Sequence, residues 1–526
     1  MNATSRRLLA VAATTALAAP LLLSASPASA RSHDPAKDAA KDAAKLSRKL
    51  VREASAGDAY RHLEKFQAIA DSANGNRAAG TLGHDASAAY VYSQLKKAGY
   101  QVSYNTFDIT YIETLAEKLT VTAPTPRDVA ITAMSYTTST KEGGIAADLA
   151  AVPVDATTGC EPADYAAGAF TGKIALIQRG GCDFATKQKE AAAAGAVAAI
   201  IYNNTEGALS GTLGGPDAGK IPTGGITQAE GQALAAEAAK GAVKVSLDIR
   251  QLQEERTTRN VVAETKGGRA DRTVMLGSHL DSVTEGPGIN DNGSGSAGLL
   301  EVALKLAKTH DKPANKVRFA WWSAEELGLL GAEAYVNGLT AAQRADIALY
   351  LNFDMIASPN FAQFVYDGDD SDGVGAGPGP EGSAQLEKGI TDFLDSKKVP
   401  HEGTDFDGRS DYGPFIDAGI PSGGTFTGAE GIKSEAQATK YGGEAGIAYD
   451  KCYHSACDDL SNINMKAFGI NIDVIANAVG TYAHDLSSVT KPAAAKPTAT
   501  AEAARIPLKR GETETVSHSR GHTPTA

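Results

Sequence analysis

The sequence predicts an α/β fold with a mixed, largely parallel sheet that carries helices on both faces. From Asn260 onward, short and continuous apolar stretches alternate with helical segments. Such stretches are typical of strands that are buried on both sides of a sheet. Between residues 130 and 248 the chain is rich in Ala and Gly and its elements are short, which predicts a second, smaller β-rich α/β domain inserted into the first. A chain of 526 residues is long enough for both.

The N-terminal 30 residues have the features of a secretory signal peptide. Arg6 and Arg7 precede an apolar run over residues 8–23, and a small-residue Ala-Ser-Ala stretch follows at residues 28–30, as at a cleavage site. A membrane anchor is the alternative, but a spanning helix needs about 20 apolar residues, and no second run of that kind follows. We therefore expect a secreted, extracellular protein without a membrane partner. The arginine pair alone leaves the twin-arginine route open.

Two further segments flank the expected domains. Residues 31–57 are charged and Ala-rich with little apolar face, which predicts a solvated helix that serves as a pro-segment or linker. Residues 487–526 are rich in Pro, Ala, Thr and Lys, which predicts a disordered tail. Between them we expect a discontinuous domain of residues 58–129 and 249–486, interrupted by the inserted domain of residues 130–248.

Charge and cysteine usage restrict the partners and the compartment. The net charge of -12 argues against nucleic acid, because phosphate binding needs a basic face. The four cysteines, Cys160, Cys182, Cys452 and Cys457, form two pairs that are local in sequence, and in an exported chain this favours two disulfides. A thiolate metal site is the alternative, but neither pair has the C-x-x-C spacing. We expect the protein to be a monomer.

The elements of the larger domain follow in order. Helical periodicity on both sides of the turn-rich residues 74–87 predicts two helices there. Later, apolar runs predict strands, and the segments between them predict helices. The strands are expected at residues 274–276, 317–322 and 347–353, and the helices at residues 295–307 and 326–336.

The inserted domain contains one clear βαβ-like unit. Residues 173–178 and 197–202 predict strands, residues 183–194 predict a helix, and Gly195 marks the end of that helix. The segment has no cluster of His and carboxylate residues, so we expect it to be non-catalytic.

Polar residues follow the strands of the larger domain where those strands end. In open α/β sheets, ligands bind at the carboxyl ends of the strands. Two imidazoles and three carboxylates would suit two divalent cations that share one bridging carboxylate. Their donor types alone fit zinc, manganese or cobalt. The candidate ligands are His279, Asp291, Glu326, Asp354 and His454. Glu325, next to Glu326, would then stay free to transfer protons.

Each of these residues has an ordinary alternative. A lone His279 or His454 is more often a surface or satisfied core residue than a ligand. Adjacent glutamates at a helix start commonly interact with the helix dipole. Asp291 in a Gly-rich loop is commonly a turn former, and Asp354 could cap a following segment. Their concurrence at several strand ends favours a metal site, because buried carboxylates without compensating charge are costly. A further acidic stretch, residues 366–375, suggests calcium but lacks the spacing of an EF-hand loop, which favours a solvated loop instead.

Five blocks of the sequence resemble peptidase family M28, the secreted di-zinc aminopeptidases, and especially its streptomycete type. The resemblance covers residues 58–99 and 259–486. The blocks are residues 277–301, 321–335, 351–356, 408–415 and 453–458. Residues 171–204 resemble the protease-associated (PA) domain inserted in some secreted peptidases, which implies a Cys160–Cys182 disulfide and a lid or substrate-selecting role.

The resemblance to family M28 implies a role for each site residue. Two zinc ions would be bridged by Asp291, with His279 and Asp354 on one ion and Glu326 and His454 on the other. Glu325 would act as general base and Tyr453 as a hydrogen-bond donor to the oxyanion. Met355 and Phe426 would line an apolar pocket for the first substrate side chain, and Arg409 would order the site near the substrate amine.

The implied activity is hydrolysis of the first peptide bond of peptides and proteins that have a free N-terminus, with a preference for large apolar N-terminal residues. A carboxypeptidase or dipeptidase on a similar di-zinc fold remains an alternative. A single-zinc glutaminyl cyclase and a degenerate extracellular binding protein are the alternatives from other functional classes.

Overall fold

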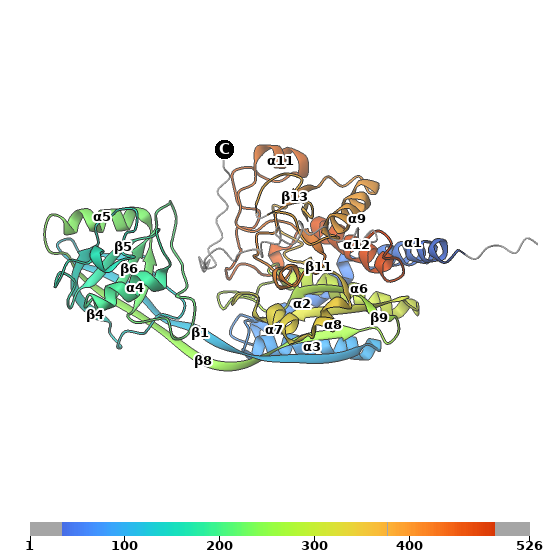
Figure 1. Ribbon diagram of the computed structural model, residues 1–526, viewed down its shortest axis with the longest axis horizontal. Helices are drawn as coiled ribbons and strands as arrows, with labels where there is room; N and C mark the ends of the chain where they lie inside the picture. The colour runs from blue at the N-terminus through green and yellow to red at the C-terminus, as the bar shows by residue number, and fades with distance from the viewer. Residues whose placement is uncertain (1–33, 376, 490–526) are drawn as a thin grey trace, which may run out of the picture.

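The computed structural model describes residues 34–375 and 377–489 (Figure 1). The expected signal peptide and residues 490–526 of the expected tail lie outside the described residues. The described chain forms a 14-stranded mixed sheet that continues from a large domain into a smaller one. Within the part of the chain that the structure describes, no helix has the length and apolar character needed to cross a membrane.

The centre of the large domain is a set of four parallel strands, in the order β14-β11-β9-β10. Antiparallel neighbours flank this set, with β12 pairing with β14 and β8 pairing with β10. The strands are β9 (Arg269–His279), β10 (Asn315–Trp322), β11 (Ile347–Phe353), β12 (Phe364–Tyr366), β13 (Glu402–Thr404) and β14 (Ser422–Phe426). The predicted fold class, a mixed and largely parallel sheet, is confirmed.

Helices cover both faces of this sheet, because successive side chains of each buried strand point to opposite sides. On β9, Val274 and Leu276 belong to one apolar cluster, whereas Met275 belongs to another. The first cluster packs under α2 (Ala56–Asp71), α3 (Leu82–Ala98), α6 (Gly293–Thr309), α9 (Ser383–Ser396) and α12 (Met465–Tyr482). The second packs under α7 (Leu330–Gly338) and α10 (Gly413–Asp417). The shorter α8 (Ala341–Ala345) and α11 (Glu435–Tyr441) complete the domain.

Helix α1 (Pro35–Glu53) differs from the solvated helix that the sequence analysis expected. One of its faces, which includes Leu46 and Leu50, is buried against α12. The hydroxyl of Ser47 donates a hydrogen bond to Asn477 Oδ1 at 2.7 Å. A Cβ atom at Gly480 would lie 2.3 Å from Ser47 Cα, so the glycine allows the close approach. The expectation of a helix with little apolar face is therefore wrong, and its proteolytic removal stays a prediction.

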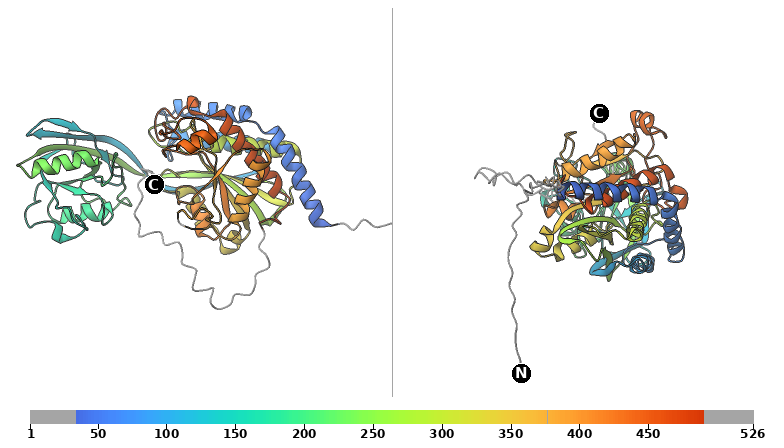
Figure 2. Two further views of the ribbon diagram at one scale, coloured as in Figure 1. Left: turned by 90° about the horizontal axis from the view of Figure 1, so that it is seen from above. Right: turned by 90° about the vertical axis from the view of Figure 1, so that its right-hand side faces the viewer.

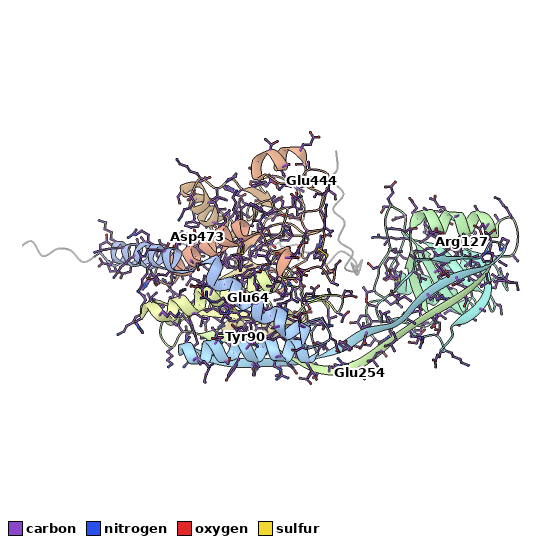
Figure 3. All side chains as sticks on the ribbon, turned by 180° about the vertical axis from the view of Figure 1, so that it is seen from behind. Glu64, Tyr90, Arg127, Glu254, Glu444 and Asp473 are labelled. Atoms are coloured by element: carbon purple, nitrogen blue, oxygen red, sulfur yellow. A yellow bond between two sulfur atoms is a disulfide. The ribbon has the colours of Figure 1, made fainter. Side chains whose placement is uncertain are left out.

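A long two-stranded ribbon joins the two domains (Figures 1 and 2). Strands β1 (Gln101–Ala123) and β8 (Lys244–Glu264) pair antiparallel over nearly their whole length, from Gln101 opposite Glu264 to Ala123 opposite Lys244. In Figure 3, Glu254 marks the ribbon and Arg127 the smaller domain. The boundary expected after residue 248 falls inside β8.

The ribbon leaves the large domain at the edge where the parallel strands end. Arg318 of β10 pairs with Glu264 of β8, and Trp321, nearer the end of β10, pairs with Val261. The carboxyl end of β10 therefore points along β8 toward the smaller domain. This places the smaller domain on the same side of the molecule as the carboxyl edge of the sheet.

The smaller domain contains the predicted βαβ unit and a closing disulfide. Its apolar core lies between the strands and helices α4 and α5. Cys160 and Cys182 form a disulfide in this domain. The elements are β2 (Arg127–Val129), β3 (Thr132–Ala133), β4 (Ile145–Ala151), β5 (Ile174–Gln178), α4 (Phe184–Ala193), β6 (Ala198–Tyr202), β7 (Thr223–Ile226) and α5 (Gln228–Ala238).

Candidate metal centre

The carboxyl edge of the central strands brings the predicted ligands together. His279 is the last residue of β9, Asp354 directly follows β11, and Asp291 lies in the loop before α6. Because β9 and β11 are parallel neighbours, both ends reach the same edge. The strand β10 on the other side of β9 leads to the turn that carries Glu325 and Glu326.

Asp291 lies between the two histidines and faces each with a different oxygen. Its Oδ1 is 3.3 Å from His279 Nε2, and its Oδ2 is 3.2 Å from His454 Nε2. His279 Nε2 is also 3.3 Å from Asp354 Oδ1, and His454 Nε2 is 3.0 Å from Glu326 Oε2. Asp291 is therefore shared by both imidazoles, whereas Asp354 lies at His279 and Glu326 at His454.

Glu325 and Glu326 lie in a turn rather than at the start of a helix. The helix expected from residue 326 begins only at Leu330, and both carboxylates are buried, with 1 % and 8 % of the residue exposed. The backbone N–H of Glu325 donates to Asp281 Oδ1 at 3.3 Å. Glu325 Oε2 lies 3.8 Å from His279 Nε2. The turn thus directs the two adjacent carboxylates to different parts of the cluster.

His454 reaches the cluster from a loop that a disulfide closes. Cys452 and Cys457 are bonded to each other, five residues apart. The ring of Tyr453 stacks on the ring of His454 with centroids 3.9 Å apart, and the Tyr453 hydroxyl oxygen is buried. Asp458 accepts hydrogen bonds from two consecutive backbone N–H groups, including that of Asp291 at 2.9 Å, so it connects this loop to the loop of Asp291.

The cluster has a strong excess of negative charge, because Asp291, Glu325, Glu326 and Asp354 surround only two imidazoles. Burial alone would lower the pKa of His454, but Glu326 and Asp291 outweigh it and raise the pKa to about 10. Burial would also lower the pKa of His279, yet Asp354 and Glu325 raise it well above its usual range. Such a site favours cations, because bound positive charge offsets the carboxylates.

The donor atoms of the cluster fit divalent metal ions. His279 Nε2, His454 Nε2, Asp354 Oδ1 and both Glu326 oxygens are buried without a hydrogen-bond partner among the described residues. Unpartnered buried polar atoms are costly. Ligand atoms from His279, Asp291 and Asp354, and likewise from Asp291, Glu326 and His454, lie within 4.8 Å of one another. Mixed imidazole and carboxylate donors suit zinc.

The three residues predicted to contact substrate come from three separate segments of the large domain. Met355 directly follows Asp354 and is buried, with a left-handed backbone φ of 45°. Phe426 ends β14, and its ring lies 6.0 Å from that of Phe364. Arg409 Nη2 forms an ion pair with Glu430 at 3.1 Å. Their roles in binding remain predictions.

Sequence reasoning missed the residues that hold the ligands in place. Ser410 donates a hydrogen bond to Asp354 Oδ2 at 2.5 Å. His279 Nδ1 lies 3.2 Å from the carbonyl oxygen of Asp281. Arg77 is fully buried, and its Nε donates to Pro287 O at 2.9 Å, while its other nitrogens donate to Leu280 O and Gly288 O. Ser410 and Asp281 stand inside recognisable motif blocks, whereas Arg77 is more than 200 residues away in the chain.

The acidic residues 366–375 form a separate group outside the cluster. Oxygen atoms of Asp367, Asp369 and Glu387 lie within 4.8 Å of one another. However, the Asp367 carboxylate accepts hydrogen bonds from the backbone N–H groups of Asp369, Ser371 and Asp372. The carboxylate therefore stabilises its own loop, as an Asx turn does, and calcium binding there stays a prediction.

Sequence comparisons identify two known families in the chain. The model of peptidase family M28 matches residues 260–479, and the model of the PA domain matches residues 145–234. Leucine aminopeptidase 2 of Trichophyton tonsurans is 44% identical over 452 residues, which cover 86% of this chain and 89% of the relative. A probable leucine aminopeptidase 2 of Aspergillus oryzae is 47% identical over 419 residues, with coverage of 79% and 82%.

Solved structures of similar proteins have the same architecture. An aminopeptidase from Aneurinibacillus sp. strain AM-1 has a TM-score of 0.67 at 27% identity and covers 85% of this chain and 98% of its own. A zinc aminopeptidase from Bacillus subtilis has a TM-score of 0.61 at 27% identity, with coverage of 81% and 94%. The family resemblance noted in the sequence is confirmed, and the chain belongs to peptidase family M28 and carries a PA domain.

Proposed function

We propose that this protein is a secreted, zinc-dependent aminopeptidase that binds two zinc ions. The observation that carries the proposal is the position of Asp291, whose two carboxylate oxygens face His279 and His454 separately. A bridging carboxylate between two metal ions needs this arrangement. His279 and Asp354 would hold one ion, and Glu326 and His454 the other. Aminopeptidase relatives that align with this chain over most of their own length support the same reaction.

Glu325 is the general base in this proposal. It is buried beside the ligands, and no ligand role is needed for it once Glu326 binds metal. Zinc held by these residues would supply a Lewis acid that lowers the pKa of water to about 7 and polarises the substrate carbonyl. The Glu325 carboxylate takes the proton of the attacking water and returns it to the leaving amine. The buried Tyr453 hydroxyl donates a hydrogen bond to the oxyanion that develops on the substrate.

The substrates are peptides and proteins with a free N-terminus, and large apolar N-terminal residues such as leucine are preferred. The names of the fungal relatives support leucine. Met355 and Phe426 would form the apolar contacts, and Arg409 would order the site near the substrate amine. Two disulfides support an oxidising, extracellular location.

Hydrolysis of leucine p-nitroanilide, compared with its N-acetylated analogue, tests this function. We expect hydrolysis of the free amine only, loss of activity after removal of metal with a chelator, and recovery when zinc is added back. Equal hydrolysis of the blocked analogue would exclude an aminopeptidase. Activity that persists in the metal-free protein would exclude the metal mechanism.

A further inference from the structure

The turn that carries Glu325 and Glu326 is tied to the interdomain ribbon by Asn260 of β8. Asn260 is fully buried. Its Oδ1 accepts a hydrogen bond from the backbone N–H of Ser323 at 2.9 Å, and its Nδ2 donates to Gly331 O at 2.8 Å. Ser323 stands just before the turn and Gly331 just after it. One side chain of the ribbon therefore joins the two ends of the turn.

Two neighbouring polar side chains of the ribbon reinforce this connection. Nδ2 of Asn260 donates a second hydrogen bond to Asn105 Oδ1 of β1 at 2.9 Å, so both amide hydrogens and the amide oxygen are used. The hydroxyl groups of Thr258 and Ser323, both fully buried, lie 2.7 Å apart. Buried polar networks with all members satisfied fix a single arrangement.

Apolar side chains of the ribbon support the same turn from β1. Ile109 forms a small cluster with Ala79 and Ala324, and Phe107 packs against this cluster together with Leu327 and Leu330. Ala324 directly precedes Glu325 and has a left-handed backbone φ of 59°. For a residue with a Cβ atom this conformation is sterically unfavourable. The turn therefore depends on contacts from outside itself.

We propose that Asn260 is a positioning residue for the peptidase reaction, through which the ribbon that carries the PA domain holds the Glu325 carboxylate in place. Asp281 holds the backbone N–H of Glu325 from the strand side, and Asn260 holds the turn from the ribbon side. The proposal rests on the proposed role of Glu325 as general base. It goes beyond that role because it assigns control of the base to the strand that leads from the PA domain (Figure 1).

The test is the isosteric variant Asn260→Asp, which keeps an acceptor for Ser323 N–H but loses both donated hydrogen bonds. Because small misplacements of reacting groups can cost about 100-fold in rate, we expect kcat for leucine p-nitroanilide to fall about 10- to 100-fold. KM should stay within about twofold because no substrate contact changes, and both zinc ions should be retained because four of the five ligands lie outside this turn. The matched control is Thr257→Ala, which removes an exposed hydrogen bond from β8 to Asp108 of β1 and should keep kcat within about twofold.

A rescue experiment separates positioning from general loss of structure. In the Asn260→Asp background, Ala324→Gly should recover kcat at least about threefold, because glycine adopts positive φ without the steric cost. If Asn260→Asp does not fold, Thr258→Val takes its place, with an expected kcat loss of about 3- to 10-fold. An unchanged kcat in whichever of these two variants folds would overturn the inference.

The Glu325→Gln variant shows which of the two ideas fails. If Glu325→Gln is inactive while Asn260→Asp is fully active, the positioning role is wrong and the general base stands. If Glu325→Gln keeps full activity, the proposed base is wrong, and the positioning role falls with it.

Discussion

At the scale of single residues, the site depends on how Asp291, in the loop before α6, is held by the loop that carries His454. Its backbone N–H donates to Asp458 at 2.9 Å, and its carboxylate oxygens face His279 and His454. Burial alone would raise the pKa of Asp291, but the neighbouring imidazoles of His279 and His454 outweigh it and lower that pKa. Asp291 is therefore ionised and ready to bridge two cations.

Replacing His454 by alanine should remove metal as well as activity. The substitution leaves Glu326 without its imidazole neighbour at 3.0 Å, so one ion loses a ligand. We expect one zinc ion fewer per chain and a fall in kcat/KM of at least about 100-fold. Metal content measured by elemental analysis checks this. A variant with unchanged zinc would show that His454 is not a ligand.

Glu325→Gln should also lose turnover but, unlike His454→Ala, should retain both ions. Glutamine keeps the size of the side chain but cannot accept the proton of the attacking water. A fall in kcat of about 100- to 10,000-fold is expected, within the range for a general base. Steady-state kinetics and zinc analysis of the same sample provide the measurement. Near-native turnover would contradict the assignment.

At the scale of elements, buried neutral His62 on α2 predicts a specific pH dependence of stability. Its Nδ1 lies 2.6 Å from the Tyr90 hydroxyl on α3 (Tyr90 is labelled in Figure 3). Burial, with a smaller contribution from Arg61, lowers the pKa of His62 to about 4 from 6.5. Between these values the unfolded chain binds a proton that the folded chain does not.

The contribution of neutral His62 to the free energy of unfolding should therefore be fully present above pH 6.5. It should decrease by about 3 kcal/mol as the pH falls to about 4. In His62→Gln, which can still accept the Tyr90 hydrogen bond, this contribution should be absent. Urea unfolding of the metal-free protein at pH 7 and pH 4 measures the difference between wild type and variant. Equal losses in both proteins would contradict a buried neutral histidine.

Helix α1 should behave as part of the folded domain. Leu50 is fully buried against the large domain, so Leu50→Ala should lower the free energy of unfolding by about 3 kcal/mol. Lys41→Ala, on the exposed face of the same helix, is the matched control and should have little effect. A thermal unfolding curve for each variant checks this. No difference between the two variants would mean that α1 is dispensable for stability.

The elements also show what sequence patterns can and cannot predict. The strand at residues 347–353 is found with the expected bounds, because a strand buried on both faces is a continuous apolar run. Helix α1 was misjudged because the small and polar residues Ala43 and Ser47 belong to its buried face. The ribbon was missed because a two-stranded ribbon is largely exposed and lacks apolar alternation.

For the site, the sequence predicts the candidate ligands but not the residues that hold them in place. The candidate ligands stand directly at strand ends or in recognisable motifs, so the rule for open α/β sheets places them. Asn260 and Arg77 could not be predicted, because their partners lie about 60 to 200 residues away in the chain and no local pattern marks a side chain that binds distant backbone groups.

At the scale of the whole molecule, the metal-binding cluster lies at the carboxyl edge of the parallel strands, and the ribbon leads from that edge to the PA domain. Because β10 pairs antiparallel with β8, the ribbon extends outward beyond the carboxyl end of β10 (Figures 1 and 2).

The most direct test of the central claim, two zinc ions bridged by Asp291, is anomalous diffraction from crystals of the zinc-loaded protein at the zinc absorption edge. We expect two peaks about 3.5–4 Å apart, one beside each carboxylate oxygen of Asp291. A single peak, or peaks away from Asp291, would contradict the account.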